Sequence, residues 1–270
     1  MATQPGQQLL GAPSSGVVVS GGGSGIGRAC CLAVAAVGRP VAAWDVDGDG
    51  AEATARACAD QGVAALGVAV DVTDAPAVAT ARDVTLEALG SIGGLVHAAG
   101  IVQPALEDVV DLDTWDAVLA VNLRAEAVLV SVLLGSLKSS GPGSAIVGIS
   151  SIEGLIGHGF IPSYVASKHA LIGLTRSLAH RLGPDGIRAN AVCPGYVVTP
   201  MLAPTIATPE ARASFERKVP VGRLAEPDDV ARVVRFLLSE EAAYVNGAAI
   251  VVDGGVTAVG GQEALGGAEA

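Results

Sequence analysis

Tyr164 and Lys168 stand four residues apart in the segment Tyr-Val-Ala-Ser-Lys, at the expected start of a helix. At that spacing on a helix the two side chains share one face. A free tyrosine has a pKa of about 10 and is a poor base at neutral pH, whereas a neighbouring cation favours its phenolate. Lowering that pKa by ~3 units takes about 4 kcal/mol, of which Lys168 can supply a part. The pair is a candidate for proton transfer, although a Tyr-x-x-x-Lys spacing alone is common on solvated helices.

Further polar residues stand where apolar runs end or helices are expected to begin. Ser151 closes one run and precedes Tyr164 by 13 residues, and Asn122 is expected to begin another helix. Pro194-Gly195 follows a later run, and Thr199 stands four residues beyond that glycine. The carboxyl ends of strands in an open α/β sheet are where such folds bind ligands. These residues therefore extend the tyrosine–lysine pair to a candidate catalytic constellation.

A glycine-rich turn, SGGGSGIG, spans residues 20–27 between an apolar run and a helical stretch. Glycines at such a turn let the backbone approach a pyrophosphate, and the helix that follows offers free N–H groups. The spacing Gly21-x-x-x-Gly25-x-Gly27 departs from the strict G-x-G-x-x-G pattern, so a merely flexible turn stays an alternative. The residues of this turn predicted to bind a nucleotide are Ser20, Gly21, Ser24, Gly25, Ile26 and Gly27.

Asp45 ends the next apolar run, 18 residues after Gly27. A carboxylate in that place hydrogen-bonds the hydroxyls of an adenosine ribose and repels a 2′-phosphate. No Lys or Arg occurs between Pro40 and Gly50, and Ser24 stands where a basic residue would otherwise reach that phosphate. These features favour NAD over NADP. A solvated aspartate in a turn is the alternative interpretation.

Seven short apolar runs alternate with helical stretches along the chain. Runs that are β-branched and do not alternate with polar residues suit strands covered on both faces. Helical connections between such strands give parallel crossovers. The sequence therefore predicts an α/β fold, a single doubly wound Rossmann-type domain with a seven-stranded parallel sheet and helices on both faces. The runs are residues 16–20, 41–44, a third ending at Val70, 95–96, 145–149, 187–192 and 248–252.

The chain reads as one domain over residues 16–257, preceded by a flexible N-terminus over residues 1–15 and followed by a loosely held tail over residues 258–270. For a chain of 26.6 kDa, folding buries roughly 72% of the surface of the unfolded chain, enough for a sizeable core. No internal repeat or linker divides it.

Composition narrows the expected partners. Sixteen basic and 27 acidic residues give a net charge of −11, which repels phosphate backbones, so nucleic acid is not expected. The first fifteen residues hold no Lys or Arg, and the longest apolar stretch, residues 127–137, falls short of the ~20 residues of a membrane span. A signal peptide and a membrane segment are therefore not expected. The cysteines show no metal-ligand spacing, so we expect no metal site, reduced thiols and a cytoplasmic protein. They are Cys30, Cys31, Cys58 and Cys193.

Taken in this order and spacing, the features resemble the short-chain dehydrogenase/reductase family, in its NAD-preferring branch with chains near this length. The resemblance covers essentially the whole chain, from about residue 16 to residue 257. The matching positions are Gly21, Gly25, Gly27, Asp45, Asp71-Val72, Ala99-Gly100, Asn122, Ser151, Tyr164, Lys168, Pro194-Gly195 and Asp253-Gly254-Gly255.

The resemblance implies direct hydride transfer between NAD(H) and a small secondary alcohol or ketone, with the hydride chemistry belonging to the cofactor. Tyr164 is then the general acid/base, and Ser151 positions the substrate oxygen. Lys168 holds the nicotinamide ribose and lowers the pKa of Tyr164, while Asn122 anchors a water in the proton relay. The cofactor contacts implied in the same way are Asp71 and Val72 flanking the adenine, Thr199 at the carboxamide, and Ala99, Gly100, Pro194 and Gly195.

Two positions depart from the family pattern. Ser20 replaces the usual threonine and keeps its hydroxyl. His97 and Ala98 replace the usual pair of asparagines before Ala99. We expect His97 to be a buried, hydrogen-bonded histidine rather than a catalytic group.

Substrate identity is expected to depend on residues 153–163 and 196–219, with Glu153 or His158 either discriminating polar substrates or facing solvent. The segment 200–220, rich in proline, is a candidate lid. The resemblance also implies a homo-oligomer, commonly a tetramer, through helices that contain residues 123–137 and Tyr164.

Two other functions stay open from the sequence. One is reduction of 3-oxoacyl thioesters, which would more usually use NADPH, and Asp45 argues against it. The other, from a different class, is a catalytically silent protein that binds NAD as a sensor. Such a sensor would be expected to lose the tyrosine or the lysine, and both Tyr164 and Lys168 are present.

Overall fold

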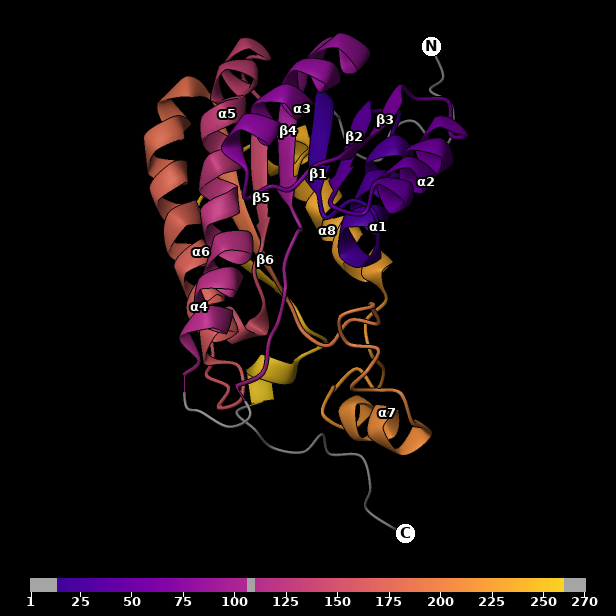
Figure 1. Ribbon diagram of the computed structural model, residues 1–270, viewed down its shortest axis with the longest axis vertical. Helices are drawn as coiled ribbons and strands as arrows, with labels where there is room; N and C mark the ends of the chain where they lie inside the picture. The colour runs from indigo at the N-terminus through magenta and orange to yellow at the C-terminus, as the bar shows by residue number, and fades with distance from the viewer. Residues whose placement is uncertain (1–13, 106–109, 260–270) are drawn as a thin grey trace.

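The seven apolar runs form seven parallel strands of one sheet in the computed structural model, which describes residues 14–105 and 110–259. The strand order is β3-β2-β1-β4-β5-β6-β7, so the chain moves outward from β1 to β3 and then returns to β4 on the other side of β1 (Figure 1). The predicted fold class is confirmed. The strands are β1 Gly16–Ser20, β2 Val41–Asp45, β3 Ala65–Ala69, β4 Ile92–His97, β5 Ala145–Ile149, β6 Arg188–Pro194 and β7 Ala249–Val252.

Helices connect successive strands and begin at residues that suit helix N-termini. The side chains of Asp47 and Asp74 cap α2 and α3 by accepting hydrogen bonds from backbone N–H groups, and Pro162 and Pro227 open α6 and α8. The helices are α1 Gly25–Ala35, α2 Gly48–Ala59, α3 Ala75–Leu89, α4 Leu112–Leu119, α5 Ala125–Ser139, α6 Pro162–Leu182, α7 Pro209–Glu216 and α8 Pro227–Leu237.

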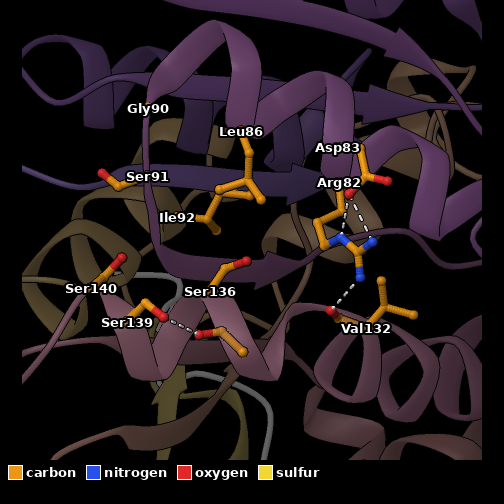
Figure 2. Close-up of a pocket in the computed structure, with 11 residues that line it drawn as sticks. Arg82, Asp83, Leu86, Gly90, Ser91, Ile92, Val132, Ser136, Ser139 and Ser140 are labelled. Carbon is orange, nitrogen blue, oxygen red and sulfur yellow. Dashed lines mark hydrogen bonds and ion pairs between the residues drawn. The ribbon is translucent and has the colours of Figure 1, made fainter.

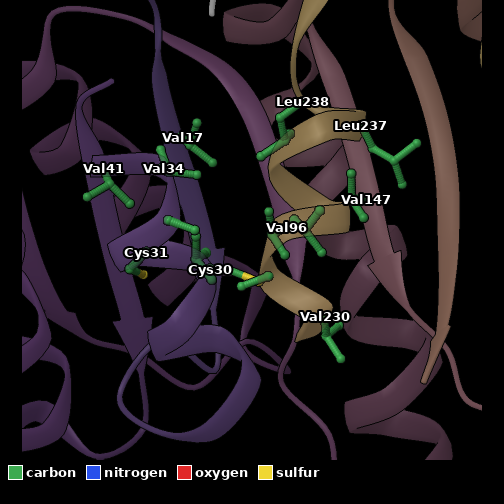
Figure 3. Close-up of a cluster of buried hydrophobic side chains, with 14 of the residues drawn as sticks. Val17, Cys30, Cys31, Val34, Val41, Val96, Val147, Val230, Leu237 and Leu238 are labelled. Atoms are coloured by element: carbon green, nitrogen blue, oxygen red, sulfur yellow. The ribbon is translucent and has the colours of Figure 1, made fainter. Parts of the chain in front are cut away.

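The core consists of two apolar layers, one on each face of the sheet. Helices α1, α2 and α8 cover one face, where Val17 and Val34 pack with Val230 (Figure 3). Helices α3, α5 and α6 cover the other, where Val18 packs with Leu129. Successive side chains of a strand point to opposite faces. A central strand such as β1 is therefore apolar at consecutive positions, which explains why its run shows no alternation.

Helices α4 and α5 are continuous, because a π-helical turn over Ala120–Arg124 joins them. Asn122 lies in this turn and does not begin a helix, so that part of the sequence-based prediction was wrong. A π-turn inserts an extra residue per turn, a distortion often found at functional sites. The resulting 28-residue helix, Leu112–Ser139, is long and apolar enough to cross a membrane by length and composition alone. The core helix of a globular domain can pass the same test. In this helix Leu129 and Leu133 are fully buried in the core of the domain.

Helix α7 and its flanking loops lie beyond the carboxyl ends of the strands, on the far side from α3 (Figure 1). Ile206, Val219 and Leu224 form a small core there, against which Tyr196 and Phe215 pack. This segment is the one predicted to act as a lid, and that remains a prediction.

The termini predicted to be loose fall largely in residues 1–13 and 260–270, outside the described residues. Ser15, inside the predicted N-terminal segment, is buried. Its carbonyl oxygen accepts a 2.7 Å hydrogen bond from Arg39, whose guanidinium also donates to Leu238 O at 3.0 Å. The first described residues are thus tied to the core at the end of α8.

Candidate active site

The glycine turn between β1 and α1 requires glycine at particular positions. A Cβ on Gly27 would lie 2.0 Å from the carbonyl oxygen of Gly21, and one on Gly21 would lie 2.6 Å from the backbone nitrogen of Ala99. Gly21 and Gly25 also have φ of +69° and +51°, a region that favours glycine. The side chain of Ser24 makes no capping bond to α1, so the N–H groups at this helix terminus stay free for a ligand. The turn therefore has a fixed shape that depends on glycine, and it is not merely a flexible connection. Its free N–H groups could hold an anion.

A cavity of about 640 Å³ opens in front of this turn, at the point between β1 and β4 where the strand order reverses. Ligands of doubly wound sheets bind at this position. Five residues predicted to contact the cofactor do not line the cavity: Ser20, Tyr164, Lys168, Pro194 and Gly195. Ser20 lies behind the turn, fully buried. The predicted cofactor residues that do line it are Gly21, Ser24, Gly25, Ile26, Gly27, Asp45, Asp71, Val72, Ala99, Gly100 and Thr199. The other lining residues were not among the predicted cofactor contacts, and they are Val46, Val70, Ala98, Ile101, Val102, Val121, Pro200 and Met201.

Two carboxylates mark one end of the cavity. Asp45 accepts hydrogen bonds from the backbone nitrogens of Gly23 at 2.8 Å and Asp47 at 3.0 Å. Asp71 accepts from the nitrogen and the hydroxyl of Thr73, and these bonds hold the pKa of its carboxyl below the usual range. The cavity lining contains no Lys or Arg. This end of the cavity therefore carries negative charge without a partner cation.

His97 connects β4 with β1 and with the π-turn. It is fully buried, and its Nε2 donates to the carbonyl oxygen of Val121 at 3.2 Å. Its Nδ1 then accepts from the Ser20 hydroxyl at 2.8 Å. Burial, and next the positive charge of Lys168, lowers the pKa of His97 to about 3, so the ring is neutral. His97 is the buried, hydrogen-bonded histidine that the sequence analysis expected.

Asn122 uses its side-chain amide within the protein. Its Oδ1 accepts from the backbone nitrogen of Ile101 at 2.8 Å, and its Nδ2 donates to the carbonyl oxygen of Ile101 at 2.9 Å. Nδ2 also lies 3.1 Å from the hydroxyl oxygen of Ser167 on α6. Asn122 therefore holds the loop after β4 to the long helix and to α6.

Lys168 and Tyr164 both lie in the first part of α6. The Lys168 side chain is buried, and its Nζ donates to the carbonyl oxygen of Ile149 at 2.8 Å and lies 5.4 Å from the centre of the Tyr164 ring. Burial lowers the pKa of Lys168 to about 8, an effect that the charge of Glu126 opposes. Burial raises the pKa of Tyr164 well above 10, and Glu153 raises it further, while a hydrogen bond with Ser151 acts against both. Tyr164 is consequently a protonated phenol in this arrangement.

Ser151 immediately follows β5 and faces a carboxylate. Its hydroxyl donates to Oε2 of Glu153, and the backbone nitrogen of Glu153 lies 3.2 Å from the Ser151 oxygen. The charge of Glu153 also raises the pKa of Tyr196, after burial of that phenol. Of the two polar candidates, Glu153 therefore lies at the catalytic groups. His158 is exposed in the following loop, where its ring is 6.1 Å from that of Phe160.

Sequence reasoning missed two residues near the site, Gln103 and Glu126. Oε1 of Gln103 is buried without a hydrogen-bond partner, in the loop that Ala105 joins to Phe160 through a 2.9 Å backbone bond. Both carboxylate oxygens of Glu126 are buried without a partner. A lone acidic residue in an otherwise apolar helix was the available signal for Glu126. No such signal marks Gln103.

A second pocket of about 480 Å³ lies between α3 and α5, beside the start of β4 (Figure 2). Arg82 reaches across it, pairing with Asp83 at 2.7 Å and donating to Val132 O at 3.5 Å. None of the predicted site residues lines it. In the part of the chain that the structure describes, no group of three His, Cys, Asp or Glu side chains is arranged to hold a metal ion, and the four cysteines are free and buried.

A parallel sheet with a glycine-built cavity at its reversal point, next to a Ser, Tyr and Lys at the carboxyl ends of its strands, defines a nucleotide-dependent oxidoreductase. A family model described as enoyl-(acyl carrier protein) reductase, of the short-chain dehydrogenase/reductase family, matches residues 21–257. The chain belongs to the short-chain dehydrogenase/reductase family.

Known members of the family are similar over nearly the whole chain. Cis-4-hydroxycyclohexanecarboxylate dehydrogenase of Sinomonas cyclohexanicum is 42% identical over 243 residues, covering 90% of this chain and 96% of that protein. A candidate NAD(P)-dependent gluconate 5-dehydrogenase from Beutenbergia cavernae, with NADP bound at low occupancy, has a TM-score of 0.84 at 37% identity, covering 92% and 98%. Levodione reductase has a TM-score of 0.86 at 32% identity, covering 92% and 99%. The relatives are dehydrogenases that oxidise hydroxyl groups and reductases that form them, and the family uses nicotinamide cofactors.

Proposed function

We propose that this protein is an NAD-dependent dehydrogenase that interconverts a secondary alcohol and its ketone, with Tyr164 as general acid/base. The observation that carries the proposal is the position of Tyr164, which lies between buried Lys168 and the hydroxyl of Ser151. A phenol held beside a buried cation and a hydroxyl donor is suited to exchanging a proton with a substrate oxygen.

The residues at the cavity fit a nicotinamide dinucleotide. Gly21 and Gly27 leave the space that a Cβ would fill, and the free N–H groups at the start of α1 suit a pyrophosphate. Asp45 would hold the adenosine ribose, and the absence of a basic residue from the cavity lining supports NAD over NADP. When bound, the nicotinamide supplies the hydride donor or acceptor.

Proton transfer belongs to the residues of the chain. In ketone reduction, Tyr164 donates its phenolic proton to the substrate oxygen, and Ser151 turns from Glu153 to hydrogen-bond the same oxygen. The ammonium of Lys168 stabilises the phenolate that remains. In alcohol oxidation the same groups act in reverse, so the phenolate accepts the proton. A water held at Asn122 is also part of the proposal. The side-chain amide of Asn122 is itself bound to Ile101 and Ser167, so such a water would bind another atom of this residue.

The surroundings of Ser151 favour a substrate with a compact apolar body. Leu155, Ile156 and Phe160 are exposed in the loop between β5 and α6, Glu153 is half-buried, and Oε1 of Gln103 is buried. The similarity to a dehydrogenase of a hydroxylated cyclohexane ring supports the same class of substrate. A secondary alcohol on a carbocycle is therefore the first substrate to test.

Two alternatives have different predictions. The family model described as enoyl-(acyl carrier protein) reductase favours testing 3-oxoacyl thioesters with NADPH as well. A protein that only senses NAD would bind the cofactor without turnover.

A homotetramer formed through α5 and α6, and a cytoplasmic location, are further proposals that rest on the family resemblance.

The test is formation of NADH from NAD with cyclohexanol, cis-4-hydroxycyclohexanecarboxylate, small diols, polyols and a steroid alcohol, run in parallel with Tyr164→Phe. We expect turnover with at least one substrate and a loss of about 10²–10⁴-fold in the variant. Tyr164→Phe that keeps full activity would exclude the proposed acid/base. An increase in melting temperature with NAD, without turnover on any alcohol or thioester, would favour the sensor.

A further inference from the structure

A buried acid lies behind the catalytic groups without any role in the reaction described above. Glu126 is the second residue of α5, one turn beyond Asn122, and it is 0% exposed to solvent. Neither carboxylate oxygen has a hydrogen-bond partner among the described residues. Burial of a carboxylate without partners costs several kcal/mol, so a group of this kind needs a compensating interaction.

The place of this carboxylate is prepared on the neighbouring strand. Gly148 lies in β5, and a Cβ there would come within 2.8 Å of Oε1 and 3.1 Å of Oε2 of Glu126. The next residue, Ile149, provides the carbonyl oxygen that accepts the hydrogen bond from Lys168 Nζ. The acid and the ammonium therefore meet β5 at consecutive residues. A side chain at position 148 would therefore have to displace the carboxylate from this place.

Lys168 is the charged group whose electrostatic effect on Glu126 is resolved. The titratable side chains packed round the pair are Tyr164 on α6, His97 on β4 and Cys193 on β6. Burial keeps His97 deprotonated and raises the pKa values of Tyr164 and Cys193, so all three are neutral near pH 7. For Glu126 and Lys168, the charge of each group opposes the effect of burial on the pKa of the other. Burial raises the pKa of Glu126 to about 8 against the effect of Lys168, and burial lowers the pKa of Lys168 to about 8 against the effect of Glu126. The two groups therefore titrate over the same pH range, and there each charge favours the other.

We propose that Glu126 is a positioning residue that acts through Lys168: on the alkaline side of neutrality its ionised carboxylate is the buried counter-charge that keeps the Lys168 ammonium protonated beside Tyr164. An ammonium so deeply buried loses its proton easily, and an unprotonated amine would no longer stabilise the phenolate. No direct ion pair joins the two side chains in the described part of the chain. The interaction therefore acts through the low-dielectric interior, where it is screened little. The importance of this interaction to turnover rests on the proposed function. The effect of Glu126 on the protonation of Lys168 does not, because it can be measured without turnover.

The sequence makes a direct measurement simple, because the chain contains three lysines, Lys138, Lys168 and Lys218. Protein labelled with ¹³C at lysine Cε gives one NMR titration for each, assigned with Lys138→Arg and Lys218→Arg. We expect Glu126→Gln to lower the pKa of Lys168 by about one pH unit or more relative to the wild type. Lys138, which pairs with Asp185 at 2.9 Å on the surface, is the internal control and should not change.

Two further variants separate charge from packing. Glu126→Met removes the charge and fills the space with apolar atoms, and it should lower the pKa of Lys168 as Glu126→Gln does. It also provides the measurement if the glutamine variant fails to fold. Glu126→Asp keeps the charge and should retain most of the wild-type value. A pKa of Lys168 that is the same in the wild type and in both uncharged variants would overturn the inference.

The pH profile of turnover gives a second readout that a purely structural role would not move. In Glu126→Gln, Lys168 would lose its proton at lower pH. The fall of kcat on the alkaline side of the profile should therefore begin at a pH about one unit lower than in the wild type. If the wild type turns over substrate and the pKa of Lys168 is the same in Glu126→Gln as in the wild type, only the inference about Glu126 is contradicted. A protein without turnover whose Lys168 pKa still falls contradicts the proposed function alone.

Discussion

The carboxylate of Asp45 accepts a 2.8 Å hydrogen bond from the backbone nitrogen of Gly23. The side chain expected to choose between NAD and NADP therefore also braces the glycine turn on which the pyrophosphate would lie. A Cβ on Gly23 would come within 2.9 Å of the same carboxylate, so the turn and the acid are fitted to each other. The proposed cofactor preference and the shape of the turn are therefore expected to depend on the same residue.

Replacing Asp45 tests this double role. Asp45→Asn keeps an oxygen that can accept from Gly23 and removes the charge, so it should narrow the ratio of kcat/KM for NAD over NADP by about tenfold with little loss of stability. Asp45→Ala removes both charge and acceptor. It should narrow the ratio in the same way and cost about 1 kcal/mol of unfolding free energy in addition. Both ratios are measured with the same alcohol, and an unchanged preference in both variants would show that Asp45 does not select the cofactor.

A methyl group at position 27 is predicted to close the pyrophosphate cradle. Because that Cβ would lie 2.0 Å from Gly21 O, Gly27→Ala must move backbone atoms of the turn. We expect at least a tenfold weaker Kd for NAD by calorimetry. Gly173→Ala in α6 is the matched control, since nothing lies within 4 Å of a Cβ there. The control should bind NAD normally, and normal binding by Gly27→Ala as well would argue against the cradle.

The carboxylate of Glu153 is predicted to hold back alcohol oxidation at neutral pH. It binds the hydroxyl of Ser151 and its charge raises the pKa of Tyr164. Glu153→Gln removes that charge, so the pKa of Tyr164 falls and the phenolate forms at lower pH. The rise of kcat for alcohol oxidation with pH should then begin at lower pH than in the wild type. A profile that stays in place, or moves to higher pH, would show that Glu153 does not act on Tyr164.

His97 is predicted to make the protein sensitive to acid. Its pKa is 6.5 unfolded and about 3 in the fold, so the unfolded chain binds the proton first. The stability from the neutral ring is present above pH 6.5 and is lost as the pH falls toward 3, by up to about 5 kcal/mol at 1.36 kcal/mol for each pH unit.

Chemical denaturation of the wild type and His97→Asn at pH 7 and pH 4 measures this contribution. The asparagine can still hydrogen-bond but does not titrate, so its loss of stability between the two pH values should be smaller. Glu126 contributes with the opposite sign, because its pKa is raised and its ionisation on going from pH 4 to pH 7 disfavours the fold. That contribution is present in both proteins and cancels in the comparison. Equal losses in the two proteins would exclude His97 as the acid-sensitive group.

Much of the fold could be predicted because its signals are local. A central strand such as β1 is buried on both faces, so its residues are apolar without alternation wherever the strand lies in the sheet. The glycine turn follows in the same way, since a tight turn between a strand and a helix requires glycine at Gly21 and Gly27. Most of the predicted cofactor residues line the cavity, while the roles of the candidate catalytic residues stay a prediction.

The start of a helix at Asn122 was predicted wrongly, because a π-turn depends on contacts that the local sequence does not contain. The turn is held by Ile101, from the loop after β4, and by Ser167, from α6. Nothing in the residues next to Asn122 specifies these partners.

Sequence by itself determined which residues form strands and turns, because hydrophobic periodicity and glycine spacing act between near neighbours, and it supplied the candidate catalytic set. Only the tertiary structure decided how charge is distributed behind that set. Glu126, Gly148 and Lys168 come from α5, β5 and α6, and only packing of these elements buries the acid beside the ammonium. A protonation state depends on the solvent and charges that surround a group in space. Residues distant in the chain create that environment only once the sheet and its helices have assembled.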